Sequence, residues 1–135
     1  MKRLTWRAAA IAVLLAAAAA QDNPAVLKAD IPFPFVVANR TLPAGHYILS
    51  ILGEHTIRIA NAQKLGEFVL TSRVDGRAPE STGKLVFYRY EDSYFLAQVW
   101  SPGNHRGKQV YKSAAEKELE RKGASKEIAV LRTEN

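Results

Sequence analysis

Aromatic and polar side chains alternate between residues 84 and 106, and this stretch has the residue types that best suit binding. Tyrosine and tryptophan supply a large rigid surface with one polar atom, which fits contact with a carbohydrate, a peptide or another protein. The candidate contact residues are Tyr88, Arg89, Tyr90, Tyr94, Gln98, Trp100, His105 and Arg106. Simple alternation along a strand predicts one shared face for Tyr94, Leu96, Gln98 and Trp100. The alternative is that these rings form part of the core, because strands select aromatic residues in any case.

Histidine is the second side chain that offers chemistry, and the chain has three: His46, His55 and His105. None has the i, i+2 or i, i+4 spacing that places two ligands on one face of a strand or helix. His46 and His55 flank one predicted hairpin, and Glu54 or Asp92 would have to complete a zinc site, which usually takes three or four ligands. We therefore predict no metal and no cofactor.

Hydrolase chemistry has little support in the residues. Neither a G-x-S-x-G elbow nor an H-E-x-x-H helix motif is present. Glu91 and Asp92 are adjacent in a predicted turn and point apart, whereas glycoside hydrolysis needs two facing carboxyl groups. We expect a protein that is not an enzyme and has no catalytic residues, and a hydrolase with a loop-assembled site stays open as an alternative.

The charge balance invites a nucleic-acid interpretation, because 19 basic residues face 13 acidic ones and the net charge is +6. Three of the basic residues, Lys2, Arg3 and Arg7, lie at the extreme N-terminus. Farther on, Glu116, Glu118 and Glu120 alternate with lysine and arginine, which is typical of a solvated helix. We predict no nucleic-acid partner, and expect a protein, a polysaccharide or an envelope component instead.

The N-terminus has the pattern of an export signal. Residues 1–7 are basic, residues 8–20 contain only Ala, Ile, Val and Leu, and Ala18 and Ala20 form a small-x-small site before Gln21. The apolar run is 13 residues, against about 20 for a spanning helix. We predict a signal peptide over 1–20, cleavage near Ala20–Gln21 and a periplasmic or extracellular product without a membrane span. An uncleaved anchor is the alternative.

Composition limits the remainder of the chain. With 135 residues and 47% hydrophobic content, one folded domain is expected. The absence of cysteine excludes disulfides, thiolate zinc sites, iron–sulfur clusters and a lipoprotein anchor. After a flexible arm over 21–27, the single β-rich domain is expected to occupy 28–135.

Alternation of period two marks a series of short strands separated by turn residues. The predicted strands are 28–37, 46–52, 56–61, 67–71, 84–90, 94–100, 108–112 and 126–132. Pro32 and Pro34 assign the first to a sheet edge, since proline cannot donate to a ladder. The strands at 84–90 and 94–100 form a tight hairpin placed centrally in the sheet.

The period changes near the C-terminus, where Ser113 and Glu116 form a capping box and Gly123 follows a run of helix formers. A helix over about 113–122 is predicted, with Ala115 and Leu119 as its thin apolar face. The fold class is therefore mainly β: a small antiparallel β-barrel or a two-layer β-sandwich of seven or eight strands with one short C-terminal helix. The last strand is expected to pair near the first and close the sheet.

Two short runs carry a family resemblance. They are Ile31-Pro32-Phe33-Pro34-Phe35 and Leu42-Pro43-Ala44-Gly45-His46-Tyr47, followed by Gly83-Lys84-Leu85-Val86-Phe87, Tyr94-Phe95-Leu96, Gly107 and Lys112-Ser113. The pattern resembles the P-F-x-F … L-P-A-G-x-Y opening of small uncharacterised exported proteins of acidobacteria. The resemblance implies export and a β-rich domain, and it supplies no catalytic residues.

These expectations converge on a non-enzymatic exported β-domain that binds a partner, a polymer or a cell-envelope surface. The contacts are expected on the aromatic hairpin and on the loops 72–83 and 101–107. A barrel that carries a small apolar ligand is the main alternative to this binding function.

Overall fold

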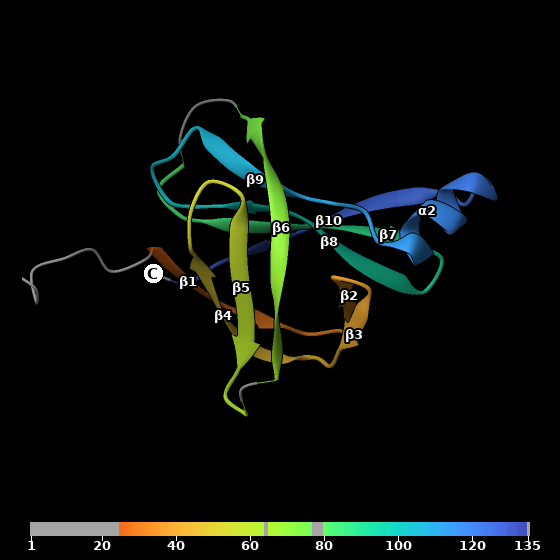
Figure 1. Ribbon diagram of the computed structural model, residues 1–135, viewed down its shortest axis with the longest axis horizontal. Coiled ribbons are helices and arrows are strands. Elements are labelled where there is room, and N and C mark those ends of the chain that lie inside the picture. Colours follow the sequence, from red (N-terminus) through yellow and green to blue (C-terminus); the bar gives the residue numbers. More distant parts are fainter. Residues whose placement is uncertain (1–24, 64, 77–79, 135) are drawn as a thin grey trace, which may run out of the picture.

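Strands predominate in the computed structural model, which describes residues 25–63, 65–76 and 80–134 (Figure 1). The strands are β1 (Ala25–Ile31), β2 (Phe35–Val37), β3 (Arg40–Leu42), β4 (Gly45–Ile51), β5 (Thr56–Asn61), β6 (Gly66–Asp75), β7 (Lys84–Tyr90), β8 (Ser93–Trp100), β9 (Arg106–Val110) and β10 (Lys126–Arg132), and the helix is α2 (Ala114–Arg121). The predicted mainly β class is confirmed. The predicted signal peptide lies outside the described residues, and within them no helix has the length and hydropathy needed to cross a membrane.

The strands form one mixed sheet. Its order is β1-β4-β5-β6-β9-β8, and β7 and then β10 follow on the other side of β8. The short β2–β3 hairpin joins β8 through one parallel pairing of Val36 with Phe95. Within the described ranges, β1 and the end of the chain meet at one isolated bridge between Lys28 and Glu134, so the sheet is not closed into a barrel. The last strand instead pairs with β7 along its whole length.

Two prolines divide the first predicted strand. The prediction of one strand over 28–37 is wrong, because β1 ends at Ile31 and β2 begins at Phe35. Pro32 and Pro34 each lack the N–H that a ladder requires, so the pairing stops between them. β1 does lie at an edge of the sheet, as expected. After β2, Ala38 and Asn39 have positive φ and turn the chain tightly into β3.

Several predicted boundaries need correction. The arm predicted over 21–27 is wrong for residues 25–27, which pair with β4, and the side chain of Leu27 is 4% exposed. Residues 72–75, predicted as loop, extend β6, because they pair with β9 from Ser72↔Gln109 to Asp75↔Arg106. The long pairing of β6 therefore brings Gly76 close to the start of β9.

The core fills the space between two halves of the sheet that cross in Figure 1, one with β4 and β5 and the other with β7 and β8. The largest fully buried side chains are Tyr47, Tyr90, Phe35, Phe87, Ile31, Leu42, Leu49, Ile57, Ile59, Leu85, Val37 and Val99. Tyr47 donates its hydroxyl hydrogen bond to the carbonyl oxygen of Pro43 at 2.6 Å. The Leu42–Tyr47 run thus ties the turn to the strand that follows it.

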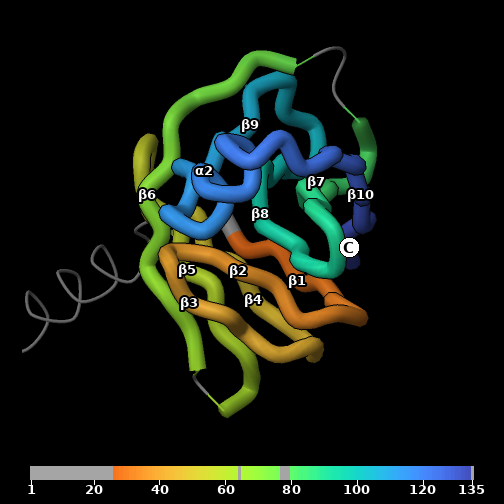
Figure 2. Tube along the Cα trace, turned by 90° about the vertical axis from the view of Figure 1, so that its right-hand side faces the viewer, coloured from red at the N-terminus to blue at the C-terminus, as the bar shows by residue number. Residues whose placement is uncertain are grey.

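The buried side-chain contact of the helix is polar, and of the predicted apolar face Leu119 alone is half-buried. Ser113 caps it by accepting a hydrogen bond from the Glu116 backbone, as predicted. Ala115 is exposed, however, and the buried side chain of α2 is Glu116, which accepts a hydrogen bond from the Tyr90 hydroxyl at 3.0 Å. Figures 1 and 2 show α2 beside the end of the molecule where β7 turns into β8.

Candidate functional site

A β-bulge divides the aromatic row predicted on the β7–β8 hairpin. Phe87 pairs with Leu96, but Val86 pairs with Gln98, so Ala97 is an extra residue on β8. Because each extra residue moves the following side chains to the opposite face, the shared face predicted for Tyr94, Leu96, Gln98 and Trp100 is wrong. The first two lie on the core side with Phe87, and the last two lie on the opposite side with Val86 and Lys84.

The tyrosine end of the hairpin is packed into the fold. Tyr94 stacks on Phe33 with ring centroids 3.7 Å apart, and Arg89 lies 5.7 Å from the Tyr94 ring. Tyr90 is 1% exposed, and Tyr88 carries the Lys126 ammonium 4.3 Å from its ring centroid. Four of the eight predicted contact residues therefore make structural contacts with neighbouring elements.

Glu116 and Tyr90 form a buried pair whose titration is shifted upward. Burial raises the pKa of the Glu116 carboxyl, and the hydrogen bond from Tyr90 opposes that change in part. Burial and the neighbouring carboxylate raise the pKa of Tyr90 above its usual range. Both pKa shifts arise because the two side chains are buried where α2 meets β7.

The Trp100 end of the hairpin is open and carries a chain of amide hydrogen bonds. The Trp100 indole N–H donates to Gln98 Oε1 at 3.0 Å, and Gln98 Nε2 donates to Gln109 Oε1 at 3.0 Å. Gln109 Nε2 in turn donates to the carbonyl oxygen of Ala97, the bulge residue, at 3.1 Å. The bulge thus anchors the hydrogen-bond chain that orients the indole ring.

Two glycines let this ring lie flat across the sheet. A Cβ at Gly107 would stand 2.7 Å from the Trp100 ring, and a Cβ at Gly76 would also collide with it. Glycine is therefore required at both positions for the ring to rest on the backbone of β9 and the end of β6. The ring is half-buried in this way, and the Lys84 ammonium lies 5.4 Å from its centroid.

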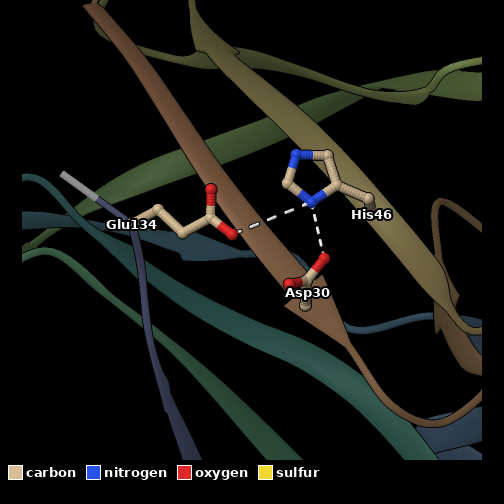
Figure 3. A group of neighbouring side chains, drawn as sticks. All are labelled: Asp30, His46 and Glu134. Atoms are coloured by element: carbon tan, nitrogen blue, oxygen red, sulfur yellow. Dashed lines mark hydrogen bonds and ion pairs between the residues drawn. The ribbon is translucent and has the colours of Figure 1, made fainter.

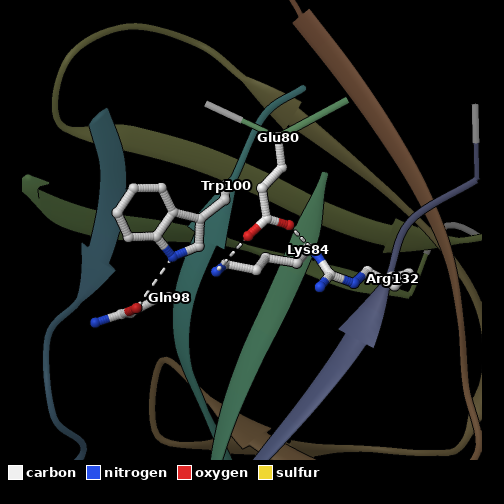
Figure 4. A network of polar contacts seen from close by, with 5 residues as sticks. All are labelled: Glu80, Lys84, Gln98, Trp100 and Arg132. Carbon is white, nitrogen blue, oxygen red and sulfur yellow. Dashed lines mark hydrogen bonds and ion pairs between the residues drawn. The ribbon is translucent and has the colours of Figure 1, made fainter. Parts of the chain in front are cut away.

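A cavity of about 320 Å³ opens beside the ring. It is lined by Gly76, Glu80, Thr82, Lys84, Trp100, Ser101 and Asn104. Strand pairing places Arg132, Lys84 and Trp100 in one row across β10, β7 and β8. Glu80 lies over this row, paired with Arg132 and 3.4 Å from the Lys84 ammonium (Figure 4). The hydrogen bond from Arg132 lowers the pKa of the Glu80 carboxyl, which stays ionised at neutral pH.

A second cavity of about 340 Å³ adjoins the first. It is lined by Glu54, His55, Arg73, Asn104, Arg106, Gly107 and Lys108. Asn104 lines both cavities, and its Oδ1 accepts a hydrogen bond from the Arg106 backbone at 3.0 Å. Of the predicted residues, Trp100 and Arg106 line these cavities and Gln98 orients the ring, whereas His105 contributes its carbonyl oxygen to Gly76 N–H at 2.8 Å.

Other lining residues are not visible from the strand pattern, because loops and distant strands supply them. Glu80, Thr82 and Lys84 precede or begin β7, and Arg132, the ion-pair partner of Glu80, comes from the last strand. One available signal is Gly107, since a glycine inside a strand marks a close approach of another group. Ser81 and Lys84 also have S-x-x-K spacing, but Lys84 begins a strand, and i, i+3 residues share a face only on a helix.

Asp30, His46 and Glu134 form a separate polar cluster on the surface (Figure 3). His46 Nδ1 lies 2.5 Å from Asp30 Oδ1 and 3.9 Å from Glu134 Oε1. Each residue offers one ligand atom within 4.8 Å of the others, so these are the described side chains that could hold a metal ion. All three are exposed, and the ion pairs join β1, β4 and the residue that bridges to Lys28. The pairing of His46 with His55 that the sequence left open is replaced by this one.

Three comparisons with known proteins found no match: no family model, curated protein or solved structure matches the chain. The resemblance to acidobacterial exported proteins stays a prediction. We therefore infer function from the cavities and side-chain clusters of the described residues.

Proposed function

We propose that the protein is a non-enzymatic exported domain that binds a polysaccharide, with one sugar ring against Trp100. The observation that supports this most strongly is the fixed indole ring, which rests on two glycines, is oriented by Gln98 and lines a cavity of about 320 Å³. A sugar ring has an apolar face of C–H groups, which packs on an aromatic surface, and a rim of hydroxyls, which needs polar partners. Glu80, Thr82 and Asn104 line the same cavity and supply such partners.

A rigid aromatic group also lowers the cost of binding. Association costs free energy for every side chain that must be ordered. The Trp100 ring is already held by its indole hydrogen bond and by its packing on Gly76 and Gly107. Binding therefore costs little further conformational entropy of this side chain. The surface is therefore preorganised for a flat ligand.

The alternative of a carrier for a small apolar ligand has less support. The space between the sheet halves is filled by side chains such as Tyr47, Phe35 and Phe87, which are at most 1% exposed. By residue type, charged and polar residues outnumber apolar ones in the linings of the two cavities at the Trp100 end. Such linings favour a hydroxyl-rich ligand over an apolar one.

The carboxylates also support binding without hydrolysis. Glycoside hydrolysis requires two carboxyl groups, one of which acts as an acid through a raised pKa. Among the residues that the structure describes, one carboxylate lines the cavity beside Trp100: Glu80, whose pKa is lowered. The His46–Asp30 pair, which resembles part of a hydrolase triad, lines neither of the two cavities described above.

The proposal is tested by titrating the chain from Gln21 with soluble polysaccharides in a calorimeter, using laminarin, galactomannan and polygalacturonate. Trp100→Ala is expected to weaken binding at least tenfold, because a central aromatic anchor carries about 2 kcal/mol or more. The matched control is Tyr111→Ala, which removes an aromatic side chain that is 62% exposed and lines neither cavity. Absence of binding to all three polymers, or equal loss in both variants, would contradict the proposal.

A further inference from the structure

Asp30, His46 and Glu134 bring three polar side chains together on the surface from three separate segments of the chain (Figure 3). Strand pairing sets Asp30 on β1 directly opposite His46 on β4. The Glu134 amide donates to the carbonyl oxygen of Lys28 at 2.8 Å, and Lys28 shares a face of β1 with Asp30. Backbone hydrogen bonds therefore hold the three segments, and with them the three side chains, in one place.

The charge of this cluster suits a divalent cation. Asp30 and Glu134 supply two carboxylates, and His46 lies within ion-pair distance of both. Among the residues that the structure describes, no lysine or arginine forms an ion pair with either carboxylate, although Lys28 shares their face of the sheet. Histidine binds a metal through its neutral imidazole, so in that form the cluster has a net charge of about −2.

The separations of the possible ligand atoms fit a small metal ion. His46 Nδ1 lies 2.5 Å from Asp30 Oδ1 and 3.9 Å from Glu134 Oε1, and the three atoms lie within 4.8 Å of one another. Bonds of about 2.0–2.2 Å to Zn²⁺ place its ligand atoms roughly 3.0–3.5 Å apart. Because all three side chains are exposed, small rotations bring them to that spacing without disturbing the core.

We propose that Asp30, His46 and Glu134 form a binding site for a divalent transition-metal ion of the Zn²⁺ type. One imidazole nitrogen and two carboxylate oxygens are donors that such an ion accepts, and water completes its coordination. Ca²⁺ and Mg²⁺ prefer oxygen ligands alone, so the imidazole disfavours them. The sequence prediction of no metal considered His46 together with His55, whereas these two carboxylates come from β1 and from the segment after β10.

The ion links a seam of the sheet where backbone pairing is sparse. Within the described ranges, β1 and the segment after β10 pair through the isolated bridge between Lys28 and Glu134. The chain has no cysteine, so a disulfide cannot make this link. An ion that binds the folded form alone raises the ratio of folded to unfolded chain about hundredfold when its concentration is about 100 times Kd. The site is thus a structural cross-link, separate from the Trp100 cavity.

Calorimetric titration of the untagged chain from Gln21 with ZnCl₂ tests the site without any polysaccharide. His46→Ala and Glu134→Gln are each expected to weaken Zn²⁺ binding at least tenfold, since losing even a group that only orients a metal ligand costs about 10- to 100-fold. The matched control is His55→Ala, which removes an exposed histidine that lies 3.9 Å from a single carboxylate, Glu54. This control is expected to keep the full Zn²⁺ affinity.

Hydrogen exchange of the Glu134 amide tests the cross-link. Zn²⁺ is expected to slow this exchange in the unaltered chain and to leave it unchanged in His46→Ala. Absence of Zn²⁺ binding, or equal losses of affinity in His46→Ala and His55→Ala, overturns the site. Equal affinity for Ca²⁺ and Zn²⁺ also overturns it, because the carboxylates would then attract cations without the imidazole. Zn²⁺ binding that depends on His46 but does not slow exchange at Glu134 overturns the cross-link.

Discussion

The two ends of the β7–β8 hairpin use the same kinds of side chain for different purposes. At one end, Tyr90 donates to Glu116 beneath α2, and both side chains are at most 3% exposed. At the other end, Trp100 borders a cavity together with Glu80, whose side chain is 45% exposed. The aromatic ring and carboxylate at the helix end stabilise the fold, whereas those at the cavity end remain available to a ligand.

The two carboxylates report this difference through opposite changes of pKa. Removal from water raises the pKa of Glu116, and the Arg132 hydrogen bond lowers that of Glu80. Burial and charge pairing act on the same chemical group in opposite directions. A carboxylate near an aromatic ring is therefore not by itself a sign of a binding site; the surroundings decide what it does.

The largest expected effect is on stability at the buried end. Tyr90→Ala should lower the free energy of unfolding by about 3–5 kcal/mol, because it removes a large core side chain and leaves Glu116 buried without its hydrogen-bond donor. Trp100→Ala should cost less than half as much, since its ring is partly exposed. Urea denaturation of both variants measures the difference. Equal losses would show that the two ends do not differ in the way described.

A smaller effect on stability is expected at the glycines on which Trp100 packs. Gly107→Ala should lower the free energy of unfolding by about 1–3 kcal/mol, the usual cost of overpacking, because its Cβ would stand 2.7 Å from the ring. The displaced ring should also lose its polysaccharide affinity.

The control for this substitution is Gly53→Ala, since nothing lies within 4 Å of a Cβ there. It should leave both stability and affinity unchanged, as measured by urea denaturation and by calorimetric titration. If Gly107→Ala kept its full polysaccharide affinity, the flat position of the Trp100 ring would not be needed for binding.

The smallest effects concern pH. Because the folded pKa of Glu116 is raised, its contribution to stability is complete below its unfolded pKa and is lost as pH rises through the folded value. The contribution of Glu80 has the opposite sign: its folded pKa is lowered, so the contribution is present above the unfolded pKa and is lost as pH falls through the folded value.

These signs are measured by urea denaturation between pH 3 and about 8. Glu116→Gln should remove a decrease in stability toward neutral pH, and Glu80→Gln should remove a decrease toward acid pH. Parallel changes in the two variants would contradict the assignment of one buried and one paired carboxylate.

The strands could be predicted because buried and exposed side chains alternate, as Tyr47 and Leu49 or Ile57 and Ile59 show. The helix start could be predicted from Ser113 and Glu116, whose spacing forms a local motif. Glu116 nevertheless fulfils a second role as a buried acceptor for Tyr90, a contact across 26 positions that no local pattern contains.

The candidate site was only partly predictable for related reasons. Alternation identifies Trp100 and Gln98 as neighbours, but it assumes a constant register, and the extra residue Ala97 breaks that assumption. The ion pair between Glu80 and Arg132 joins positions 52 apart in the chain, so it depends on the pairing of β10 with β7. The sequence correctly marks Pro32 and Pro34 as unable to donate to a ladder. That property predicts one continuous strand at an edge of the sheet, whereas in the structure it divides the strand into β1 and β2.

The most direct test of the central claim uses the indole N–H of Trp100. A chain that begins at Gln21 contains this tryptophan alone, because the other is Trp6. Titration with the polysaccharide that binds in the calorimetric test, followed by ¹⁵N-resolved NMR, should shift the indole resonance together with the amides of Gly76 and Gly107, and leave the amides of α2 unmoved. Saturation of binding with an unmoved indole resonance, or with shifts confined to α2, would contradict the account.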